Sequence, residues 1–222
     1  MLALLLAACL FVGSHFVLSH PLRRPLVQAM GEKTFLGIYS LVALATFTAL
    51  AVAFTGAPRE PQLWDGSRPL PWVLASLLTI VAASLFSASL VGNPALPNAN
   101  LAGLSTMLPR GVYRVTRHPM MWSFALWALA HVLVAPSPRV LVLAATIALL
   151  ALGGAAMQDR KKQARASREW GVWRARTSFV PDVRNAGALG AYWGVGLALW
   201  LGATALHIAV AGIPAGVWIL FE

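Results

Sequence analysis

Long uninterrupted apolar blocks constrain this sequence more than any other feature. Hydrophobic residues make up 59% of the 222 residues and charged residues only 11%, whereas a soluble domain is nearer one quarter charged. Six blocks have about the length that a helix needs to cross a bilayer, roughly residues 2–19, 35–55, 70–91, 119–135, 138–157 and 187–211. Because hydrocarbon offers backbone groups no partner outside the helix, we predict an all-α, polytopic membrane bundle of about six transmembrane helices, forming one domain over residues 1–222.

The basic residues are distributed unevenly among the loops of this predicted bundle. A net charge of +10 is compatible with nucleic-acid binding, but 14 of the 17 Lys and Arg residues lie in the loops after the first, third and fifth spans. Cytoplasmic loops carry such an excess of positive charge. We therefore expect a multi-pass protein of the bacterial inner membrane, with both termini in the periplasm, membrane lipid as a partner and no nucleic acid.

The connecting segments carry further expectations. Residues 92–118 are either a re-entrant piece, with Asn93, Asn98 and Asn100 lining a cavity, or a solvated connector. The segment from Asp159 to Arg176 has the pattern of a basic amphipathic helix that either lies at the membrane surface or helps to close a site. In the first case, its tryptophans at positions 170 and 173 lie in the headgroup layer.

Two small-residue patterns concern the last span. The spaced glycines at positions 187, 190, 194 and 196 predict close packing against another helix. Residues 212–221 are apolar but contain Gly212, Pro214 and Gly216, so they either extend the last helix or fold back at the interface.

Histidines inside apolar spans are the strongest candidates for function. His15, His131 and His207 fall within spans, and His118 stands at the entrance of the fourth span. Each could serve only as a hydrogen-bonded packing group, but ionisable residues inside a bilayer are costly and mark functional sites. Two neutral imidazoles on facing helices are enough to hold a b-type haem. His20 precedes a proline at the membrane boundary, and we give it little functional weight.

Depth in the membrane offers a way to pair these histidines. At 1.5 Å per helical residue, His15 lies about 6 Å from the inner face and His131 about 18 Å beyond Pro119. Depth alone therefore pairs His15 with His118, and His131 with His207.

The basic turn before the fourth span holds Arg114 and Arg117, three residues apart. On one helical face, their planar guanidinium forks would suit a haem propionate, a cofactor carboxylate or a lipid phosphate. The alternative is that they serve only as inward-facing positive charge.

Several segments together resemble the NnrU family of bacterial membrane proteins. They are FVGSHF around His15, GIYSLVAL in the second span, GVYRVTRHPMMWSFALWALAH ending at His131, RTSFVPD after the basic segment, and the late His207. The resemblance implies a link to denitrification, in the expression or maturation of nitrite and nitric oxide reductases. Maturation proteins of these reductases, or a hydrophobic small-molecule substrate, are then the expected partners.

The NnrU family is similar to the plant and cyanobacterial zeta-carotene isomerase, a membrane enzyme with haem b. That similarity implies haem b as cofactor, axial ligands at His15 and His131, and an isomerase-type haem-dependent reaction. The isomerase has a ligand-switching cysteine three residues before its second histidine, where this chain has Ala128. We therefore expect no ligand switch here.

A second resemblance leads to a different class of function. GVYRVTRHPMM and the later RTSFVP are similar to segments of the isoprenylcysteine and phospholipid methyltransferases, which bind S-adenosylmethionine through an Arg-His-Pro turn and a distal acidic pair. This chain lacks the acidic pair, and the nearest acids are Asp159 and Glu169. An S-adenosylmethionine-dependent membrane methyltransferase is therefore the alternative prediction.

Overall fold

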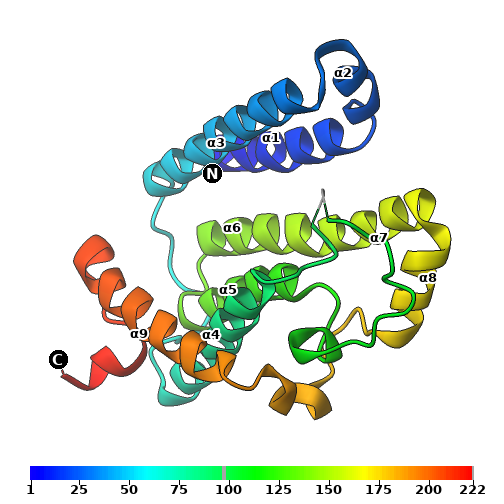
Figure 1. The fold of residues 1–222 in the computed structure, drawn as a ribbon. Coiled ribbons are helices and arrows are strands. Elements are labelled where there is room, and N and C mark those ends of the chain that lie inside the picture. The colour runs from blue at the N-terminus through cyan, green and yellow to red at the C-terminus, as the bar shows by residue number, and fades with distance from the viewer. Residues whose placement is uncertain (97–98, 222) are drawn as a thin grey trace.

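The computed structural model describes residues 1–96 and 99–221, and every regular element in these ranges is helical. Figure 1 shows the helices as rods joined by turns and one long loop. The main elements are α1 (Leu2–Ser19), α2 (Arg23–Met30), α3 (Glu32–Gly56), α4 (Pro69–Ser89), α5 (Pro119–Val134), α6 (Pro138–Ala148), α7 (Gly154–Arg165), α8 (Ser167–Arg176) and α9 (Tyr192–Ala211).

The membrane character predicted from composition is confirmed by helix length and hydropathy. Within the described residues, five helices are long and apolar enough to cross a membrane, and α5 is a shorter apolar helix of 16 residues. The fifth apolar block continues without a break from α6 through the π-helical turn η2 (Leu149–Gly153) into α7. The last span begins at Tyr192, because a 3₁₀ segment, η3 (Val183–Leu189), occupies the residues before it.

The helices pack in two groups that meet at α6. The first group is a hairpin of α1 and α3, and in the second α4 packs against both α5 and α9 (Figure 1). Helix α6 contacts α1 on one side and α5 on the other. The glycine prediction holds at Gly196, where an added Cβ would lie 2.6 Å from the Cα of Ser84. This close approach lets α9 lie directly against α4.

The loops gather at the two opposite ends of the bundle, as the charge pattern predicts. At one end, the Lys161 ammonium donates to the Ser19 carbonyl at 3.1 Å, and the Arg176 guanidinium donates to the Ser105 carbonyl at 2.9 Å. These bonds join the three basic loops. At the other end, the Trp64 indole donates to the Leu133 carbonyl at 3.1 Å. That the basic end faces the cytoplasm stays a prediction.

The expected surface helix from Asp159 to Arg176 is wrong in two respects. The helix breaks at Ala166, where φ is −142° and ψ is 65°, so that α8 turns away from α7. Trp170 and Trp173 are buried, with 0% and 2% of their surface exposed, in one cluster with Leu101 and Leu104. The indoles therefore pack inside the protein, because the loop after α4 covers them, and not in the headgroup layer.

The long loop after α4 folds back over α8 and borders a cavity of about 1180 Å³. Asn93 and Asn100 line this cavity, in agreement with the first of the two alternatives for this segment, and each side chain also accepts a hydrogen bond from the backbone amide two residues ahead. Asn98 lies outside the described residues.

The C-terminal segment folds back: α9 ends at Gly212 with φ of 64°, and the Trp218 indole in η4 (Gly216–Phe221) donates to the Thr204 hydroxyl at 3.0 Å.

Candidate functional site

The basic turn before α5 is shaped by a short helix and a proline. A 3₁₀ turn, η1, covers Gly111–Arg114, and α5 starts at Pro119 with His118 as its N-cap residue. Proline suits the first helical position, since its missing N–H has no intrahelical partner there. The chain between η1 and α5 is not helical, so Arg114 and Arg117 do not share a helical face. Arg114 is exposed and donates to the Asn185 side chain at 3.3 Å.

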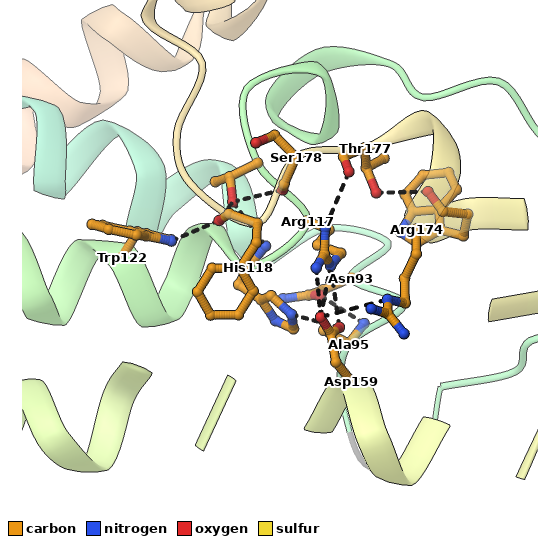
Figure 2. Close-up of polar contacts among 12 residues, drawn as sticks. Asn93, Ala95, Arg117, His118, Trp122, Asp159, Arg174, Thr177 and Ser178 are labelled. Carbon is orange, nitrogen blue, oxygen red and sulfur yellow. Dashed lines mark hydrogen bonds and ion pairs between the residues drawn. The ribbon is translucent and has the colours of Figure 1, made fainter. Parts of the chain in front are cut away.

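Arg117 and His118 converge on one carboxylate, that of Asp159 in α7 (Figure 2). The Arg117 Nε lies 3.1 and 2.9 Å from the two Asp159 oxygens, and its Nη2 lies 2.6 Å from Oδ2. The His118 Nε2 lies 2.8 Å from Oδ1. The remaining guanidinium nitrogen of Arg117 donates to the Thr177 carbonyl at 3.0 Å. Each of the three guanidinium nitrogens of Arg117 therefore donates to an acceptor within the protein.

The segment after α8 is tied to the same turn by backbone and side-chain bonds. The Arg117 amide donates to the Ser178 carbonyl at 2.9 Å. The Phe179 carbonyl accepts from the Thr116 hydroxyl at 2.7 Å and from the Trp122 indole at 2.8 Å. The two motif segments RVTRHP and TSFVPD, about 60 residues apart in the chain, thus form one structural unit.

The three central side chains of this cluster are buried, and the Arg174 guanidinium, 45% exposed, approaches Asp159 Oδ2 at 4.0 Å from the rim (Figure 2). The exposed fractions are 7% for Arg117, 1% for His118 and 6% for Asp159. The Phe179 ring covers the cluster, with its centroid 5.3 Å from the Arg117 guanidinium carbon and 5.3 Å from the imidazole centroid. Removing one partner of a buried ion pair leaves the other charge without compensation, at a cost of about 3–5 kcal/mol.

Two further acidic groups, Asp182 and Glu169, are held as carboxylates. Hydrogen bonds and charge from Arg184 lower the pKa of Asp182, whose backbone amide donates to the Val115 carbonyl at 2.8 Å. The amide of Ser105 donates to Glu169 at 2.6 Å and lowers the pKa of that carboxyl. The two acids that the methyltransferase resemblance brought forward, Asp159 and Glu169, therefore both accept hydrogen bonds within the protein.

One ring nitrogen of His118 lacks a hydrogen-bond partner. With Nε2 bonded to Asp159, its Nδ1 is fully buried and has no hydrogen-bond partner within the described residues. A neutral ring that donates through Nε2 carries a lone pair at Nδ1. His118 is thereby fixed in orientation by Asp159 and enclosed by the cluster.

The three histidines inside the membrane share one arrangement. Nδ1 lies 2.8 Å from the Phe11 carbonyl in His15, 2.8 Å from the Trp127 carbonyl in His131, and 3.0 Å from the Ile213 carbonyl in His207. Because a carbonyl only accepts, each Nδ1 is a donor. The neutral ring then carries its lone pair at Nε2, the tautomer that binds a metal through Nε2.

The structure does not join His15 to His131 through a direct contact between described residues. His15 lies next to the Tyr39 ring of α3, with centroids 5.6 Å apart, and one turn before the Ser19 carbonyl at the basic end. His131 stacks on Trp127 and lies two residues before Leu133 at the opposite end. The depth difference expected from the sequence is thus retained.

Sequence reasoning singled out Arg117 and His118 but missed the group that joins them. Asp159 is an acid in a run of basic residues, DRKK, which is typical of a solvated surface. Its position two residues after the fifth apolar block is the one signal that it could lie at the membrane boundary. Within the described residues, no group of three or more His, Cys, Asp or Glu side chains could hold a metal ion.

Comparison with known proteins places the chain in a family. The family model described as NnrU protein matches residues 3–215, nearly the whole chain. The chain belongs to the NnrU family. In this NnrU structure the match covers the membrane histidines and both segments of the Arg117–Asp159 unit. No curated protein and no solved structure matches the chain.

Proposed function

We propose that this NnrU protein binds haem b through membrane histidines and acts in the expression or maturation of nitrite and nitric oxide reductases. The observation that carries the proposal is the shared state of His15 and His131. Each ring is held at Nδ1 by a carbonyl of the preceding helical turn, at 2.8 Å, so that Nε2 keeps a lone pair. The resemblance to the isomerase assigns the axial positions to these two residues.

The chemistry of each donor, taken singly, fits a b-type haem, whereas the positions of His15 and His131 towards opposite ends of the bundle do not bring both rings to one iron in this structure. The pairing of these two residues therefore rests on the resemblance to the isomerase. Neutral imidazole is a usual axial ligand of haem iron, and a carbonyl that fixes Nδ1–H orients the ring and raises the basicity of Nε2. Both rings stand in apolar helices and are partly buried. When bound, the haem supplies one-electron redox chemistry.

The two arginines have separate tasks in this proposal. Arg117 is engaged by Asp159 and Thr177, so it positions the start of α5 and is not available to an external anion. Arg114 is exposed and makes one long hydrogen bond, 3.3 Å, to Asn185. We assign to Arg114 the binding of an anionic group, such as a haem propionate.

The test is the absorbance spectrum of the protein purified in mild detergent after expression with ample haem supply. We expect a Soret band and sharp α and β bands on reduction, with about one haem b per chain. The same preparation freed of haem should not bind S-adenosylmethionine. Absence of a Soret band together with binding of S-adenosylmethionine would replace the proposal with the methyltransferase function.

A second candidate is a haem-dependent reaction, of isomerase type, on a hydrophobic small molecule. The cavity beside α8 favours it, since about 1180 Å³ of space is lined mainly by apolar residues such as Leu104, Met107 and Trp173. A co-purified apolar compound should appear in solvent extracts by mass spectrometry. It should be lost from Met107→Trp, which fills the cavity, and kept in Leu149→Trp, an exposed site in η2. Equal extracts would contradict this second candidate.

A further inference from the structure

A second cavity lies at the basic end of the bundle, apart from the three membrane histidines and from the Arg117–Asp159 unit. Its volume is about 430 Å³, within the range of small-molecule sites. It is formed where the end of α1, the short helix α2, the start of α3 and the polar part of α7 meet. Its walls include the polar or charged side chains of His20, Arg23, Arg24, Gln28, Glu32 and Lys161.

Cationic side chains from separate elements converge on this cavity. Arg23 and Arg24 come from α2, and Lys161 comes from α7. Lys161 is held in place by the Ser19 carbonyl at 3.1 Å, across 142 residues of sequence. The lining has three cations against the single carboxylate of Glu32. Like charges kept this close repel one another unless an anion lies among them.

The carboxylate offsets only part of this charge. Glu32 accepts from Arg23 at 2.6 Å, and the Arg23 guanidinium also lies over the Phe35 ring, 5.2 Å from its centroid. Arg23 is thereby oriented, with 18% of its side chain exposed. Lys161 and Arg24 have no such carboxylate partner within the described residues.

His20 adds an unpartnered polar atom to the same wall. Its Nδ1 lies 2.8 Å from the Ser19 hydroxyl and 3.3 Å from the Phe16 carbonyl, whereas Nε2 is buried without a hydrogen-bond partner in the described structure. Burial lowers the pKa of His20 and the charge of Lys161 lowers it further, while the Phe16 carbonyl acts in the opposite direction. His20, which received little functional weight in the sequence analysis, thus lines a cavity with three cationic side chains.

We propose that this cavity binds a phosphate group, and that Arg23, Arg24 and Lys161 are its ligands. Arginine donates to phosphate through a planar fork, and lysine acts as a compact positive charge. The cavity lies at the ends of membrane helices α1 and α3, at the level of lipid headgroups, and Leu22 beside it is exposed. Basic pockets in that position bind anionic lipid headgroups, so we assign the phosphate to an anionic phospholipid.

The test measures thermal unfolding of the detergent-purified protein during titration with three probes. They are phosphatidylglycerol, phosphatidylcholine and inorganic phosphate at constant ionic strength. We expect saturable stabilisation by phosphatidylglycerol and a weaker effect of phosphatidylcholine, whose choline cancels the phosphate charge. Saturable stabilisation by inorganic phosphate instead would keep the phosphate site but assign it to a soluble phosphate compound.

Three variants separate specific binding from loss of charge or loss of fold. Lys161→Gln should weaken the apparent affinity about fivefold, the effect of one cation near a lipid surface. Arg160→Gln removes the same charge from an exposed neighbouring position and should leave the affinity unchanged. Glu32→Gln should strengthen it about fivefold, a gain that misfolding would not produce. Equal affinities in the Lys161 and Arg160 variants, or no gain in Glu32→Gln, would overturn the proposal.

Discussion

Individual side chains carry the polar contacts that join the two motif segments to α7. The single side chain of Arg117 contacts Asp159 through two nitrogens and Thr177 through a third. A lysine at position 117 would keep the charge but would donate to the carboxylate from a single nitrogen. The sequence marks Arg114 and Arg117 as equals, whereas the structure gives only Arg117 a buried partner.

We expect Arg117→Lys to destabilise the protein by about 1.5–3 kcal/mol, since hydrogen bonds to charged groups are lost. Arg114→Lys, at an exposed position with one long bond, should change stability by less than about 0.5 kcal/mol. Thermal unfolding in detergent compares the two variants with wild type. Equal losses would mean that the bonds from Arg117 to Asp159 contribute nothing beyond its charge.

The limits of sequence reasoning at this scale have a physical cause. His118 and Arg117 could be selected because polar residues beside an apolar helix stand out. Asp159 follows them by about 40 residues, and only the folded chain brings it to 2.8 Å from the His118 ring. Similarly, His20 received little weight because it stands at a membrane boundary. The cavity beside it is formed by elements far apart in the chain, so the sequence alone does not indicate it.

Helices could be predicted from the sequence where the surrounding hydrocarbon requires them. Apolar blocks must be helical in hydrocarbon, so α1, α3, α4 and α5 fall close to their expected residues. Polar segments outside the bilayer follow tertiary contacts instead, which explains the break at Ala166 and the burial of Trp170 and Trp173.

The contact between α4 and α9 depends on the absence of a side chain at one position. Gly196→Ala should force the helices apart and destabilise the protein by about 1–3 kcal/mol, as overpacking does. Gly194→Ala is the matched control, since an added Cβ there meets no atom within 4 Å. Thermal unfolding of both variants measures the difference. A stable Gly196→Ala protein beside a wild-type-like control would show that α9 does not need this close approach.

At the scale of the whole molecule, the three basic loops are gathered at one end by contacts such as that between Lys161 and Ser19. Together with the positive-inside rule, this arrangement predicts that both termini are periplasmic. A reporter that is active only in the cytoplasm should be silent when fused after Glu222 and active when fused after Arg165. Strong activity of the fusion after Glu222 would contradict the six-span topology.

The central claim is that His15 and His131 are the axial ligands of one haem b. The measurement that tests it most directly is the ferric absorption spectrum of histidine-to-alanine variants at equal protein concentration. His15→Ala and His131→Ala should each turn the haem high-spin or lose it, and His20→Ala should keep the low-spin spectrum. Because Ala128 replaces the switch cysteine, wild type should keep the same two ligands when reduced. A low-spin spectrum that survives His131→Ala but is abolished by His118→Ala or His207→Ala would contradict the assignment.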